Sequence, residues 1–105
     1  MILSIEELRR RVAPVAEKYQ LPAVYIFGSY ARGDATDHSD VDILIDRSGS
    51  RIRGMLDMGS LYTDLRDEVG KEIDLVTTQT LEQRSTLERT PEFVESVRAE
   101  MRRII

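Results

Sequence analysis

At 105 residues, the chain is long enough for one small domain with a modest hydrophobic core. Hydrophobic residues make up 41% and charged residues 32%, with no cysteine, so disulfides and thiolate metal sites are excluded. The net charge of −4 argues against direct nucleic-acid binding, which needs a basic face. No apolar run approaches the roughly 20 residues that cross a bilayer, and the N-terminus lacks a signal-peptide pattern. We therefore expect a cytoplasmic protein without membrane contact.

The first predicted element is a helix over residues 5–19. Ser4 and Glu7 form a capping-box pair, and apolar side chains then recur at helical spacing. Pro14 lies inside this run, and we expect it to kink or interrupt the helix, because an interior proline costs about 3 kcal/mol. Leu21-Pro22 ends the helix.

An apolar strand is predicted next, over residues 24–27. A Gly-Ser pair follows it and starts a short helical segment, residues 28–32, that Gly33 closes. The turn-forming residues 34–39 then lead to a second apolar strand over residues 43–45.

The second half of the chain again alternates helix and strand. Gly70 is expected to close the next helix, and residues 71–77 form a third strand. Thr80 and Gln83 resemble a capping box that opens a short helix, and Thr90-Pro91 is expected to start the last helix. The apolar stripe of the helix before Gly70 is expected to comprise Ile52, Met55, Leu56, Tyr62, Leu65 and Val69.

The order of the elements, α-β-α-β-α-β-α-α, predicts a single α/β (α+β) domain spanning residues 1–105. Its sheet is expected to be small and mixed, with three to four strands packed with helices. Helices are expected at both ends of the chain.

The pair Asp40 and Asp42, on either side of Val41, carries most of the chemistry. Because side chains alternate along a strand, both carboxylates point to the same face. Two carboxylates about 4 Å apart repel by roughly 4 kcal/mol at an effective dielectric near 20. A cation between them would relieve this repulsion, and Mg²⁺ suits an all-oxygen site that also receives substrate phosphates.

The Gly28-Ser29 turn supplies the other half of such a site. Gly28 lets the backbone approach a phosphate closely, and amides at the start of a helical segment face an anion. The Ser29 hydroxyl can donate to a phosphate oxygen. Turn and acidic pair together predict a metal-dependent nucleotidyl-transfer site.

Each of these residues also has a structural interpretation. Asp40 could cap the second strand and Asp42 could face solvent, although aspartate is depleted in strands. Gly28-Ser29 could be a turn and nothing more. Asp74, in the third strand, could be an exposed residue of an edge strand.

Other polar residues near the motif have two interpretations as well. Arg32 either binds phosphate or pairs with Asp34 or Asp37. His38, the only histidine, lies in a polar loop, where an exposed side chain is favoured over a ligand or a base. Tyr30 and Tyr62 are expected to pack in the core rather than to seat a nucleotide.

The motif is specific enough to indicate a family. Gly28-Ser29, ten intervening residues, Asp40-x-Asp42 and the later strand residue Asp74 resemble the polymerase-β-like nucleotidyltransferase superfamily. Within it, the chain is similar to the minimal nucleotidyltransferase (MNT) antitoxins of MNT–HEPN toxin–antitoxin pairs. The motif occupies residues 28–42, and the order of elements matches the family over nearly the whole chain.

The resemblance implies the polymerase-β-like nucleotidyltransferase fold and a role for each motif residue. Asp40, Asp42 and Asp74 would be catalytic and would hold two Mg²⁺ ions, with Asp74 accepting the proton of the attacking hydroxyl. The candidate nucleotide-binding residues, for ATP as substrate, are Gly28, Ser29 and Arg32.

The resemblance further implies an antitoxin that transfers AMP from ATP to a tyrosine of its cognate HEPN ribonuclease toxin, in a hetero-oligomer. Larger relatives that modify antibiotics carry a second helical domain, and we expect a partner protein to supply that acceptor half here. One alternative is a non-catalytic antitoxin that acts by steric cover. Another is transfer to a small molecule such as an aminoglycoside. Polymerisation of nucleic acid is disfavoured by the acidic balance of charge.

Overall fold

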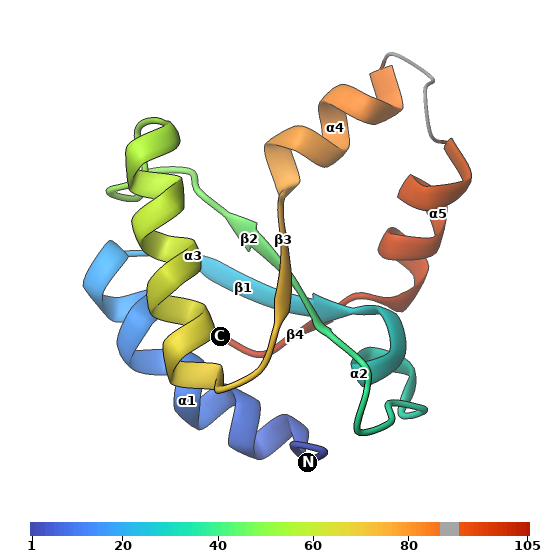
Figure 1. Ribbon diagram of the computed structural model, residues 1–105. Helices are drawn as coiled ribbons and strands as arrows, with labels where there is room; N and C mark the ends of the chain where they lie inside the picture. Colours follow the sequence, from blue (N-terminus) through green and yellow to red (C-terminus); the bar gives the residue numbers. More distant parts are fainter. Residues whose placement is uncertain (87–90) are drawn as a thin grey trace.

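The computed structural model describes residues 1–86 and 91–105 and places them in helices around a four-stranded sheet (Figure 1). Helices and strands alternate along the chain as predicted, so the α/β fold class is confirmed. The elements are α1 (Ile5–Tyr19), β1 (Ala23–Phe27), α2 (Gly28–Arg32), β2 (Val41–Asp46), α3 (Met55–Val69), β3 (Ile73–Thr77), α4 (Thr78–Thr86), α5 (Pro91–Glu100) and β4 (Arg102–Arg103).

The sheet is mixed, with the strand order β3-β2-β1-β4. Strand β1 is antiparallel to β2 and to β4, whereas β2 and β3 run parallel. The expectation that the chain ends in a helix is wrong, because Arg102 and Arg103 pair with β1. A strand of two exposed residues has no apolar alternation, so the sequence carried no signal for it.

Helices cover both faces of this sheet, with α1 and α3 on one face and α4 and α5 on the other (Figure 1). Alternate residues of β1 and β2 therefore belong to different cores. Ile43 and Ile45 pack in the core under α1 and α3, whereas Leu44 packs against α5. By the two-residue period of a strand, Asp42 shares the face of Leu44 and is directed toward α5.

Helix α1 begins as the sequence predicts but is not interrupted. The Ser4 hydroxyl accepts a hydrogen bond from the Glu7 amide at 3.1 Å and so caps the helix. The helix runs through Pro14 to Tyr19, against the expected break. Pro14 lies on the exposed side, where water can satisfy the carbonyl of Arg10 that loses its helical partner.

Helix α3 packs through its later turns and not through its first one. Gly70 ends it in the left-handed conformation, with φ of 76°, as predicted. Met55 and Leu56, expected in the apolar stripe, are instead 91% and 90% exposed. They lie in the first turn, beside a surface cavity at the end of α1. The residues of α3 that are buried are Leu61, Leu65 and Val69.

Helix α4 begins earlier than predicted, at Thr78. The Thr77 hydroxyl accepts a hydrogen bond from the amide of Thr80 at 3.0 Å, so Thr77 does the capping that we assigned to Thr80 and Gln83. Helix α5 starts at Pro91 as predicted, and Thr90 lies outside the described residues. None of the described helices combines the length and the apolar composition that crossing a bilayer requires.

Candidate functional site

The turn between β1 and α2 brings the backbone against an acidic side chain. Gly28 has φ of +68°, a conformation that residues with a Cβ rarely adopt. A Cβ atom built there would lie 2.1 Å from Oδ2 of Asp42, far inside van der Waals contact. A glycine at this position is therefore required for the Asp42 carboxylate to lie where it does.

The sheet register brings the predicted carboxylates to one end of the strands. Asp42 of β2 pairs with Asp74 of the parallel strand β3 and with Phe27 of the antiparallel strand β1. Asp40 lies two residues earlier, just before β2 begins. Asp74 is exposed on β3, an edge strand of the sheet, as its structural interpretation required.

The half-buried Asp42 is the electrostatic centre of this group. Burial, followed by the nearby charges of Asp74 and Asp40, raises the pKa of its carboxyl to about 6 from an ordinary value of 3.8. Arg32 acts in the opposite direction, and Glu100 adds a smaller upward effect. A carboxyl titrating near neutral pH among other carboxylates is typical of a functional site.

The donor chemistry of these residues fits a hard divalent cation. Carboxylate oxygens that repel one another are the ligands that Mg²⁺ prefers, and a cation would reverse the effect that raises the pKa of Asp42. Within residues 1–86 and 91–105, no three acidic, histidine or cysteine side chains converge as a ready-made metal site. Holding an ion would therefore require rotation of side chains such as the exposed Asp40 and Asp74.

A cavity of about 310 Å³ lies between this group and α5. The sequence predicted its β1–α2 wall but not its α5 wall, because nothing in the sequence indicates which side of the sheet α5 covers. Only the alternation in β2, which directs Asp42 away from α1 and α3, could have suggested it. The residues lining the cavity are Phe27, Gly28, Ser29, Arg32, Asp42, Phe93, Ser96, Val97 and Glu100.

Arg32 lines the same cavity and is held by two carboxylates. Its Nε donates to Oδ2 of Asp34 at 3.2 Å, which is one of the two pairings considered from the sequence. Its Nη1 donates to Oε2 of Glu100 on α5 at 3.0 Å, a contact that the sequence did not predict. Asp37, the other expected partner, instead forms an ion pair with the amino group of Met1 at 2.6 Å.

The other residues singled out in the sequence, Tyr30, His38 and Tyr62, do not line the cavity. Tyr30 is buried, as expected, and its hydroxyl accepts a hydrogen bond from Nζ of Lys71 at 3.1 Å. The same Nζ lies 3.4 Å from the carbonyl of Asp37, so Lys71 joins α2 to the loop before Asp40. His38 is exposed and Tyr62 is half-buried.

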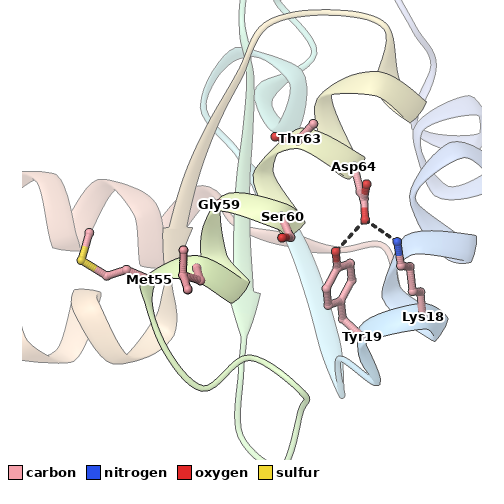
Figure 2. A pocket seen from close by; sticks show the side chains of 8 residues that line it. Lys18, Tyr19, Met55, Gly59, Ser60, Thr63 and Asp64 are labelled. Atoms are coloured by element: carbon pink, nitrogen blue, oxygen red, sulfur yellow. Dashed lines mark hydrogen bonds and ion pairs between the residues drawn. The ribbon is translucent and has the colours of Figure 1, made fainter.

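A larger cavity, of about 630 Å³, opens elsewhere on the surface, between α1 and α3. Figure 2 shows Lys18 and Tyr19 of α1 both pointing toward Asp64 of α3. Asp64 accepts hydrogen bonds from Nζ of Lys18 at 2.8 Å and from the hydroxyl of Tyr19 at 2.6 Å, and these bonds lower its pKa. With its single carboxylate already neutralised, this cavity lacks the features of a phosphate or metal site, so we assign the functional site to the smaller cavity.

Comparison with known proteins connects this site to a family. The family model described as "Polymerase beta, Nucleotidyltransferase" matches residues 10–90. A protein of Methanocaldococcus jannaschii, provisionally named as a protein adenylyltransferase, is 35% identical over 75 residues, which cover 71% of this chain and 78% of its own length. Protein adenylyltransferase MntA of Thermococcus cleftensis is 32% identical over 84 residues, covering 76% of this chain and 83% of its own.

Solved structures with a similar fold extend over nearly the whole chain. One, described provisionally as a minimal nucleotidyltransferase, has a TM-score of 0.66 and 29% identity, and the match covers 95% of both chains. Another is a crystal structure of a toxin–antitoxin with AMP-PNP, with a TM-score of 0.65 and 20% identity. That match covers 92% of this chain and 72% of the other, and it bears on the fold alone.

Proposed function

Since the chain belongs to the polymerase-β nucleotidyltransferase family, as its Gly28-to-Asp42 motif predicted, we propose that it is a protein adenylyltransferase that acts as an antitoxin. The observation that carries this proposal is the half-buried Asp42 beside a glycine turn, whose pKa is raised by burial and then by its neighbours Asp74 and Asp40. The names of the two related proteins support AMP transfer to a protein.

The transfer needs a bound triphosphate, an acceptor hydroxyl and a proton acceptor. The backbone at Gly28 and the hydroxyl of Ser29 would hold the phosphates, because both line the cavity beside Asp42. The acceptor oxygen attacks the α-phosphorus of ATP, the bond from that phosphorus to the bridging oxygen breaks, and pyrophosphate leaves. We propose that the exposed carboxylate of Asp74 takes the proton of the acceptor hydroxyl, and its pairing with Asp42 in the sheet register supports this role.

Mg²⁺ is the cofactor that we propose for this site. Asp40, Asp42 and Asp74 would hold it, as two ions, and when bound it supplies neutralisation of the triphosphate and of the leaving pyrophosphate. The oxygen donors and their mutual repulsion at Asp42 support this assignment.

The acceptor that we propose is a tyrosine of a cognate HEPN ribonuclease toxin. The family resemblance supports this partner, and the shared fold with a toxin–antitoxin that holds AMP-PNP is consistent with it. AMP on such a tyrosine would add bulk and negative charge and so block RNA from the toxin. We further propose that residues 1–105 form one minimal nucleotidyltransferase domain that works in the cytoplasm.

Labelled ATP tests this proposal directly. The chain is incubated with Mg²⁺ and the protein encoded by the neighbouring open reading frame, with ATP labelled on either the α- or the γ-phosphate. We expect label on the partner from α-labelled ATP only, and none with Asp42→Asn. Label from γ-labelled ATP would indicate phosphoryl transfer instead. Neutralisation of the toxin that survives an Asp40→Ala, Asp42→Ala double substitution would show that steric cover suffices.

A further inference from the structure

Arg32, in the proposed nucleotide cavity, already donates to carboxylates through Nε and Nη1. Among the described residues, its ion-pair partners are Asp34 on the neighbouring loop and Glu100 at the end of α5. Of the two, Glu100 is the better shielded from solvent, with its side chain 27% exposed against 63% for Asp34. Asp34 contributes more than Glu100 to raising the pKa of Arg32, but Glu100 lines the cavity and Asp34 does not, so Glu100 is the competitor at the place where a phosphate would bind.

Glu100 also adds negative charge where a nucleotide would bind. Among the described residues that line the cavity, Arg32 is the one cation, and Asp42 and Glu100 are the acids. The charge of Glu100 reaches Asp42, because it contributes to raising the pKa of that carboxyl. A triphosphate that binds Arg32 in the cavity therefore competes with Glu100 for the guanidinium and lies beside two carboxylates.

We propose that Glu100 selects for metal-loaded nucleotide by holding Arg32 in an ion pair that only a charge-neutralised triphosphate can displace. Free ATP brings several negative charges next to Glu100 and Asp42 and is repelled. A divalent cation removes part of that charge, so the same phosphates can take Arg32 from Glu100. This inference rests on the proposed nucleotide-binding function, and it assigns to α5 the discrimination between free and metal-bound nucleotide.

Equilibrium binding of ATP tests the role of Glu100 without any need for catalysis. Dissociation constants are measured by calorimetry with excess Mg²⁺ and with EDTA, for the wild type and Glu100→Gln. The amide keeps the size of the side chain and removes its charge. We expect Glu100→Gln to bind metal-free ATP about fivefold more tightly, as expected for loss of one partly screened charge interaction, and to bind Mg-ATP with a smaller change.

Two further variants separate this effect from a general change of charge or fold. Glu95→Gln removes an exposed carboxylate of α5 that does not line the cavity, and it should leave both dissociation constants unchanged. Glu100→Asp keeps the charge and should behave as the wild type. Unfolding temperatures of all variants report whether the fold is retained.

The outcomes distinguish this inference from the proposed function. If the wild type fails to bind Mg-ATP, the proposed nucleotide site is wrong, and the role of Glu100 is wrong with it. If the wild type binds Mg-ATP and Glu100→Gln has the same affinity for metal-free ATP, Glu100 has no selective role while the site itself stands. An equal gain for Glu95→Gln would reduce the effect to overall charge and would also contradict the inference.

Discussion

Replacing Asp42 by asparagine should stabilise the fold while removing activity. The carboxyl of Asp42 has a pKa of about 6 in the folded protein, compared with 3.8 as its ordinary value. Between these two pH values the folded chain retains a proton that the unfolded chain has lost. The free energy of unfolding therefore falls as the pH rises through this window, and it stays low above it. Asparagine has the same shape and no charge, so the variant lacks this loss.

The size of the effect follows from the shift in pKa. At 1.36 kcal/mol for each unit, the shift sets a ceiling of about 3 kcal/mol for the stability lost above pH 6. Asp42 is only half-buried, and solvent screens part of the interaction with Asp74 and Asp40. We therefore expect Asp42→Asn to be more stable than the wild type by ~1 kcal/mol at pH 8. Below pH 4 the two proteins should be equally stable.

Urea unfolding at pH 4, 6 and 8 measures this difference. Asp67→Asn, on the exposed side of α3, is the matched control and should stay within about 0.5 kcal/mol of the wild type at each pH. A wild type that is as stable as Asp42→Asn at pH 8 would mean that Asp42 is not electrostatically strained. The main evidence that the cavity is a metal site, the repulsion at Asp42, would then be removed.

Substitution of Gly28, addition of Mg²⁺ and substitution of Tyr19 test other features of the fold and of the site. Gly28→Ala should destabilise the fold by about 2 kcal/mol more than Gly33→Ala. Both glycines have positive φ, but of the two only Gly28 has a neighbour that an added Cβ would meet. In an Asp42→Ala background, urea titrations should show that this additional destabilisation is gone. Mg²⁺ should raise the unfolding temperature of the wild type at pH 8, measured by calorimetry, and leave that of Asp42→Asn unchanged. If both unfolding temperatures rise equally, the ion binds at a site that does not include Asp42. Tyr19→Phe should lower the free energy of unfolding by about 1 kcal/mol, because it removes the hydrogen bond to Asp64. Its ATP affinity should be unaltered, and a loss of ATP affinity would mean that the cavity between α1 and α3 takes part in the site.

The parts of the fold that the sequence could predict are those with strong local signals. Gly33 and Gly70, which the sequence predicts to close helical segments, both have positive φ. Strand β2 was identified by its apolar run, and the spacing from the Gly-Ser turn to Asp40 and Asp42 was enough to indicate the family. Each of these features depends on a few consecutive residues and on backbone geometry.

The parts that the sequence could not predict depend on tertiary contacts. Strand β4 forms because Arg102 and Arg103 pair with the edge of β1 that β2 leaves open. No local sequence pattern predicts this pairing. In the sequence, nothing distinguishes Glu100 from the other charged residues near the C-terminus, and only the fold shows its contact with Arg32. Met55 matched a helical stripe but lies in a turn that the core does not reach. Tertiary packing determines the burial and the partners of such residues, and sequence periodicity alone does not.

The proposed activity is transfer of AMP to a partner protein at the cavity around Asp42. Intact-mass spectrometry of the protein encoded next to this chain tests it most directly, after incubation with ATP, Mg²⁺ and either the wild type or Asp42→Asn. We expect the mass of the partner to increase by one or more AMP groups with the wild type and to stay unchanged with the variant. A partner that is neutralised with its mass unchanged would contradict the claim.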